Sequence, residues 1–173
     1  MNKERQIVDL ARSAIEEYII RGRRISSPEE IPQILQGKNG VFVSLKKNGK
    51  LRGCIGTTEA VQENTAEEII SNAISAAESD PRFPIVKPEE ISDLKVSVDI
   101  LGNKERVESR EDLNPEKYGV IVKKGHRTGL LLPDLKGIDT VEKQLAVAKK
   151  KAGLTPDTSV DEIYRFSVQR YQE

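Results

Sequence analysis

The feature that most constrains this chain is a pair of short apolar runs joined by Asn48-Gly49. Asn-Gly is favoured in type I′ turns, because both central residues of such a turn need a positive φ. Residues 41–46 and 51–56 are therefore predicted to pair as an antiparallel hairpin. If the loop consists of these two residues alone, counting places Val43 opposite Cys54.

Period-two alternation then assigns the side chains of this hairpin to two faces. One face is expected to carry Val41, Val43, Leu45, Arg52 and Cys54, and the other Phe42, Leu51 and Ile55. Arg52 and Cys54 would then share a face. We expect the Arg52 charge to lower the pKa of the Cys54 thiol where that thiol is exposed.

Three helices are predicted where apolar residues recur at steps of three and four. They cover residues 3–21, residues 66–78 and a stretch that starts at Asp139. Thr65 and Asp139 are the expected N-caps, since each is followed three residues later by a glutamate. Residues 26–39 are expected to form a connector with one short turn of helix.

The remaining patterns predict strands. Apolar and polar residues alternate over residues 94–101, which predicts a strand. Residues 120–124 and 127–132 flank a Gly125-His126 turn of type II′ and are expected to form a second hairpin. Residues 162–171 are expected to form one last strand. Two-residue turns cannot join parallel neighbours, so the predicted fold class is α+β with a mainly antiparallel sheet rather than α/β with a parallel one.

Composition excludes several functions. The 173 residues predict one domain or two small lobes, and 28 basic against 28 acidic residues make a nucleic-acid binder unlikely. Cys54 and His126 stand alone, which excludes a disulfide, a Cys-rich zinc site and a His-cluster metal site. No run of about 18 apolar residues and no signal or transit peptide occurs, so we expect a cytoplasmic protein without a membrane span.

The segment with the most unusual chemistry is Leu51 to Thr57, LRGCIGT. Glycine weakens a strand interior, so Gly53 and Gly56 indicate a bulge or the close approach of a backbone or ligand. Between them Cys54 has two readings, a reactive thiol or a small buried hydrophobe. Arg52 has two readings as well, an anion site or a structural ion pair.

Charged residues at the two hairpin tips are expected to be solvated. This applies to Lys46, Lys47 and Lys50 in the first hairpin, and the alternative is contact with RNA or a partner. His126 stands at the predicted tip of the second hairpin, where solvent exposure is the expectation and catalysis the alternative.

Four segments, in this order, resemble the AMMECR domain family, also called protein A of the AmmeMemoRadiSam system. They are LRGCIG at residues 51–56, Asp80-Pro81-Arg82-Phe83, Gly129 to Pro133 reading GLLLP, and Lys151 to Leu154 reading KAGL. The resemblance covers nearly the whole chain. It implies an α+β fold in two unequal lobes, with a cleft near the LRGCIG segment.

The resemblance implies an accessory or binding protein associated with Memo-like and radical SAM proteins, and no reaction is established for the family. The alternative is a thiol-dependent enzyme that acts on a small anionic substrate. The predicted site has Cys54 as the candidate catalytic residue and a set of candidate substrate-binding residues, namely Arg52, Gly53, Gly56, Thr57, Asp80 and Arg82. For Asp80 and Arg82 the alternative is a structural role, in which they tie down the chain after the helix at 66–78. No metal is predicted, and neither the sequence nor the resemblance identifies a cofactor.

Overall fold

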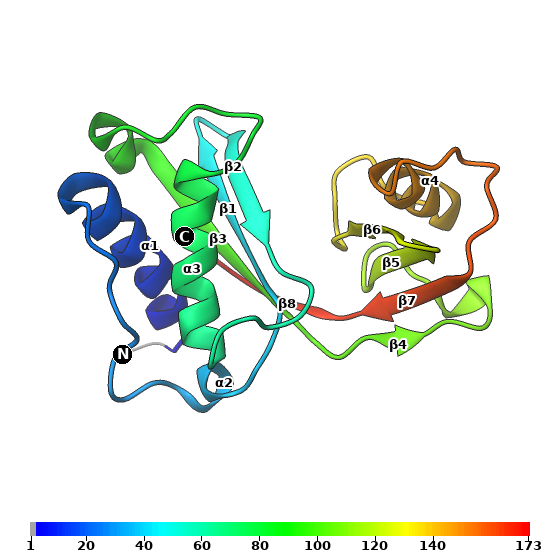
Figure 1. Cartoon of the computed structure of the whole chain (residues 1–173), viewed down its shortest axis with the longest axis horizontal. Helices are drawn as coiled ribbons and strands as arrows, with labels where there is room; N and C mark the ends of the chain where they lie inside the picture. The colour runs from blue at the N-terminus through cyan, green and yellow to red at the C-terminus, as the bar shows by residue number, and fades with distance from the viewer. Residues whose placement is uncertain (1–2) are drawn as a thin grey trace. The chain divides into compact units, whose positions relative to one another are not determined.

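The computed structural model describes residues 3–173 (Figure 1). Its elements are α1 (Lys3–Arg21), α2 (Gln33–Gln36), β1 (Val41–Lys47), β2 (Lys50–Gly56), α3 (Thr65–Glu78), a 3-10 helix (Pro88–Asp93), β3 (Leu94–Leu101), β4 (Glu105–Arg106), a second 3-10 helix (Arg110–Asp112), β5 (Gly119–Lys124), β6 (Arg127–Leu131), α4 (Val141–Lys151), β7 (Glu162–Phe166) and β8 (Val168–Gln172). The pairs β1–β2, β1–β3, β4–β7, β5–β6 and β5–β7 are antiparallel, which confirms the α+β class.

The chain forms two compact units. The first contains the residues up to Leu101 and residues 169–173, and the second contains residues 102–168. The cleft implied between two lobes stays a prediction.

The first unit is a four-stranded sheet in the order β2-β1-β3-β8, with α1 and α3 packed on one face (Figure 1). Alternate residues of β1 face those helices and are fully buried, and so are their neighbours in β3. The core joins them to the helices through Val43, Leu45, Val98, Ala11 and Ile69. Burial of these apolar side chains is the main force that holds the unit together.

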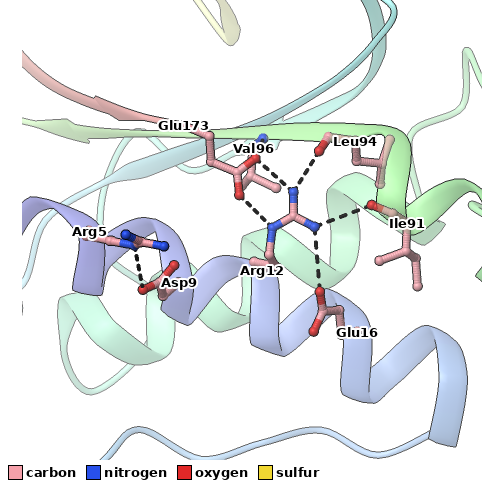
Figure 2. A network of polar contacts seen from close by, with 8 residues as sticks. All are labelled: Arg5, Asp9, Arg12, Glu16, Ile91, Leu94, Val96 and Glu173. Atoms are coloured by element: carbon pink, nitrogen blue, oxygen red, sulfur yellow. Dashed lines mark hydrogen bonds and ion pairs between the residues drawn. The ribbon is translucent and has the colours of Figure 1, made fainter.

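Within this unit, Arg12 of α1 binds Glu173, the residue that follows β8 (Figure 2). Its guanidinium donates to the carboxylate of Glu173 at 2.5 and 2.8 Å, and also to the backbone carbonyls of Ile91 and Leu94. The backbone N–H of Val96 donates to the same carboxylate at 3.2 Å. The hydrogen bonds from Arg12 first, and then from the Val96 N–H, lower the pKa of Glu173.

The second unit is a smaller sheet in the order β4-β7-β5-β6, with α4 packed on β5 and β6. The predicted hairpin is confirmed, because Lys124 of β5 pairs with Arg127 of β6 across the turn. Gly125 has a φ of 56°, as a type II′ turn requires at its first central position.

The β1–β2 hairpin has the predicted turn but not the predicted register. Asn48 and Gly49 both have positive φ, yet Ser44, not Val43, lies opposite Cys54. Lys46 pairs with Leu51 and Leu45 with Gly53, so Arg52 is the extra residue of a β-bulge.

The bulge overturns the predicted faces of β2. Gly53 and Ile55 lie on the core face, opposite Leu45 and Val43, and Cys54 lies on the outer face. A regular ladder would have placed the Arg52 guanidinium among fully buried side chains, and burying such a charge is costly. The bulge avoids this.

Three further expectations are wrong in their boundaries. The caps of α3 and α4 are Asn64 and Thr140, whose side chains accept from the N–H groups of Glu67 and Lys143. Each observed N-cap lies one residue from the expected one, and its side chain accepts from the N–H group three residues further on, which is the spacing that the prediction used. The single strand at 162–171 is two strands, β7 and β8, interrupted at residue 167 and belonging to different sheets.

Candidate functional site

Two residues of the Asp80-Pro81-Arg82-Phe83 segment cap the free edge of β2 beside Cys54. The Asp80 carboxylate, 2% exposed, accepts from the backbone N–H of Cys54 at 2.9 Å. It also accepts from the Arg82 guanidinium at 2.8 and 3.0 Å, and that guanidinium donates to the Cys54 carbonyl at 3.5 Å. Asp80 and Arg82 thus satisfy the two backbone groups that a further strand would otherwise bind.

The charges of this pair are strongly coupled. Hydrogen bonds from the Arg82 side chain, and then from the N–H groups of Arg82 and Cys54, hold the pKa of Asp80 far below its ordinary value against the opposing effect of burial. The same contact raises the pKa of Arg82, whose charge also interacts with Cys54. Arg82 remains 56% exposed, so its charge is available to a ligand.

Small polar side chains from three strands meet on the outer face of the first sheet. The Ser44 hydroxyl lies 3.1 Å from the Cys54 sulfur, and Ser97 of β3 pairs with Ser44 on its other side. One step along the sheet, Lys46 lies directly opposite Lys95, and both are exposed. This arrangement places two cations beside a row of hydroxyl and thiol groups.

Arg52 is bound by groups other than the thiol. Its guanidinium binds the Glu90 carboxylate at 2.9 and 3.1 Å and the backbone carbonyls of Pro84 and Ile85. Hydrogen bonds from Arg52 first, and then from a backbone N–H and Lys47, lower the pKa of Glu90 to about 2. Arg52 is thus largely buried in a structural ion pair, which confirms the second of its two readings.

Close packing requires glycine at positions 53 and 56. A Cβ on Gly53 would lie 2.1 Å from the carbonyl oxygen of Ala76 in α3, and a Cβ on Gly56 would lie 2.2 Å from the ring of Phe42. Both distances are far below any permitted contact. The helix and the aromatic ring, rather than a ligand, fill the space beside these glycines.

Thr57 belongs to a buried polar network that the sequence analysis did not predict. Its hydroxyl donates to Glu68 at 2.6 Å and accepts from Asn72, and Glu68 also accepts from the N–H groups of Val61 and Gln62. Glu68 is fully buried. The signal that would have revealed it is a glutamate inside the apolar stripe of α3.

The described residues thus divide the predicted site in two. Cys54, Asp80 and Arg82 come together, whereas Arg52, Gly53, Gly56 and Thr57 serve packing and structural hydrogen bonds.

His126 is exposed at the tip of the β5–β6 hairpin. Within residues 3–173 no group of three or more His, Cys, Asp or Glu side chains has a geometry that would hold a metal ion, and no helix is long and apolar enough to cross a membrane.

A family comparison identifies the chain. The family model AMMECR1 matches residues 8–171, and the chain therefore belongs to the AMMECR1 family. A protein of Thermotoga maritima is 50% identical over 98% of both chains. A protein of Clostridium acetobutylicum is 49% identical over 96% of this chain, which corresponds to 36% of that longer protein.

The fold has also been observed in a solved structure. The crystal structure of an uncharacterized protein from Pyrococcus horikoshii matches 99% of this chain and 91% of its own, with a TM-score of 0.91 and 37% sequence identity.

Proposed function

We propose that this protein is a cytoplasmic accessory protein that binds a small anionic ligand on the outer face of its first sheet. The main support is the pairing of β1 with β2 and β3, which places Cys54, Ser44 and Ser97 side by side. Next to them, Lys46 lies directly opposite Lys95. Like charges directly opposite each other destabilise a sheet. A bound anion would offset that repulsion, and the hydroxyl groups would donate hydrogen bonds to it.

Arg82 supplies a further cation at the edge of the same face. The buried Asp80 carboxylate fixes its guanidinium beside Cys54, so little side-chain freedom is lost when a ligand binds. Carboxylate and phosphate groups match the planar fork of arginine. The expected ligand therefore carries one of these groups.

Thiol catalysis is the alternative, favoured by the contact between the Ser44 hydroxyl and the Cys54 sulfur. A nucleophilic thiol usually needs a base to accept its proton, and the carboxylate beside Cys54, that of Asp80, is already bound by Arg82 with its pKa held far below the ordinary value, which makes it a weak base. We therefore place binding ahead of catalysis. A covalent adduct on Cys54 in protein isolated from its native host would reverse that order.

The experiment is mass-spectrometric identification of small molecules that copurify with the native protein, followed by calorimetric titration with succinate and inorganic phosphate. We expect one of these anions to bind, and Lys46→Gln to weaken that binding about tenfold while raising the unfolding free energy by about 0.2–1 kcal/mol. Lys38→Gln, an exposed change in the same unit, is the control. Absence of any copurifying or titratable anion would refute the proposal.

The accessory role is tested separately. We propose Memo-like and radical SAM proteins as the partners, on the strength of the family resemblance. Co-expression of the three proteins from one genome should yield a complex on size-exclusion chromatography. Separate elution of all three at micromolar concentration would refute this partnership and leave the anion site untouched.

A further inference from the structure

We propose that the first unit holds a second binding site, a cavity that takes a small apolar molecule bearing a protonated amine. The cavity has a volume of about 400 Å³ and lies between α1 and residues 25–35. Its walls include Leu10 of α1 and the side chains of Ile25, Ile31 and Leu35 from the facing segment. Small-molecule sites are largely apolar and measure about 300–1,000 Å³, so the cavity is of suitable size.

The segment that closes the cavity is held in place at several points. Glu67 of α3 binds the Arg24 guanidinium at 2.8 Å and the Ser27 N–H at 2.7 Å. Pro28 and Pro32 restrict the backbone between this anchor and α2. These restraints keep the segment from collapsing onto α1, so the cavity is formed before a ligand arrives.

The charged side chains that line the cavity determine which ligand charge it favours. Asp9 and Glu30 carry the only charges among its described lining residues, and no lysine, arginine or histidine lines it. Asp9 lies 3.8 Å from the guanidinium of Arg5 (Figure 2), but both side chains are well exposed and such a pair contributes little. Glu30 makes no ion pair or hydrogen bond with any residue from 3 to 173.

An apolar cavity with carboxylates among its lining residues is complementary to an alkyl or aryl amine. The apolar tail would replace water against the isoleucine and leucine walls, and the ammonium group would remain near Asp9 and Glu30. A fatty acid or another anionic amphiphile would be repelled by the same carboxylates. This site lies on the helical side of the first sheet, whereas the proposed anion site lies on the opposite face, so the two proposals are independent.

The test uses three probes of one chain length, octylamine, octanol and octanoate, against the whole protein. Octylamine should produce saturable amide shifts in the ¹H–¹⁵N spectrum at Leu10, Ser13 and Ile31, and bind at least about tenfold more tightly than octanoate. Equal or tighter binding of octanoate would overturn the charge argument. If none of the three probes shifts these amides, the site itself is refuted.

Two substitutions of Ser13 separate binding from folding. Ser13 lines the cavity from an exposed position of α1, so Ser13→Trp should fill the cavity and weaken octylamine binding at least about tenfold with little effect on the fold. Ser13→Ala, which leaves the cavity open, should bind like the wild type. Unchanged octylamine affinity in Ser13→Trp would contradict the proposal. Asp9→Asn with Glu30→Gln should remove the preference of the site for octylamine over octanol.

Discussion

The hairpins β1–β2 and β5–β6 are built on the same plan but differ in one residue. Both turn through two residues, and each has a glycine beneath an alanine of the helix that covers it. Gly53 lies under Ala76 of α3, and Gly129 lies under Ala148 of α4. The ladder of β5–β6 is regular, whereas that of β1–β2 contains the extra residue Arg52.

The difference shows what a single inserted residue does to a site. Without it, Cys54 would lie on the core face of β2, beneath the helices. With it, the core face receives Gly53 and Ile55, and Cys54 is presented on the outer face beside Ser44. The position of the thiol therefore depends on the bulge, whose extra residue Arg52 binds Glu90.

The largest expected effect is that of a side chain at either covered glycine. Gly53→Ala and Gly129→Ala each bring a Cβ to about 2 Å from a helix carbonyl, at 2.1 and 2.0 Å. Each should lower the unfolding free energy by about 3 kcal/mol or more, because rigid backbone must move. Chemical denaturation measures this, and Gly53→Val should be worse still.

Two substitutions that are expected to cost less serve as controls. Gly37→Ala meets only the side-chain oxygen of Asn39, at 3.2 Å, and should cost less than about 1 kcal/mol. Cys54→Ser changes a half-buried group on the outer face and should also cost less than either covered glycine. A stable Gly53→Ala protein would show that α3 does not approach β2 as closely as described.

These glycines mark the limit of what the sequence predicts. Turns are local, so Asn48-Gly49 and Gly125-His126 identified both hairpins. The bulge is not local, because it is set by α3 against Gly53 and by Glu90 against Arg52. The sequence did contain one sign of the bulge, because a regular register placed the charged Arg52 on the same face as the apolar Val43 and Leu45.

The site divides in the same way. Cys54, Asp80 and Arg82 were predicted from their motifs, and the structure brings them together. Ser97 and Lys95 were missed because only the pairing of β1 with β3 places them beside the thiol. That pairing joins residues about fifty positions apart, which no local pattern encodes.

The second effect concerns the ion pair that accompanies the bulge. Glu90→Gln keeps the shape of the side chain but removes the charge that Arg52 and Lys47 bind, and should cost about 2–3 kcal/mol. Glu162→Gln in the second unit, whose carboxylate is 34% exposed, should cost much less. Equal losses in the two variants would contradict a structural role for Arg52.

Acid should weaken the bulged hairpin through the same carboxylate. The pKa of Glu90 is about 2 in the folded chain and ordinary when unfolded, so its contribution is present above about pH 4.5 and is lost as the pH falls toward 2. Between pH 5 and pH 3 the wild type should lose about 2 kcal/mol more than Glu90→Gln. Parallel pH profiles for the two proteins would be inconsistent with this assignment.

The smallest effect distinguishes the two arginines. Arg82 interacts with Cys54, whereas the Arg52 charge is matched by Glu90. Arg82→Gln should raise the midpoint pH of the iodoacetamide reaction by about half a unit or more, and Arg52→Gln should leave it nearly unchanged. The reverse order would restore the role that the sequence assigned to Arg52.

The most direct test of this account is the rate at which iodoacetamide alkylates Cys54 in the native protein, compared with the rate of global unfolding. A thiol on the outer face of the first sheet should react without unfolding, at a rate that rises in proportion to iodoacetamide concentration. A thiol on the core face would react only as fast as the protein unfolds, whatever the reagent concentration. We expect the first result, and the second would contradict both the bulge at Arg52 and the site built upon it.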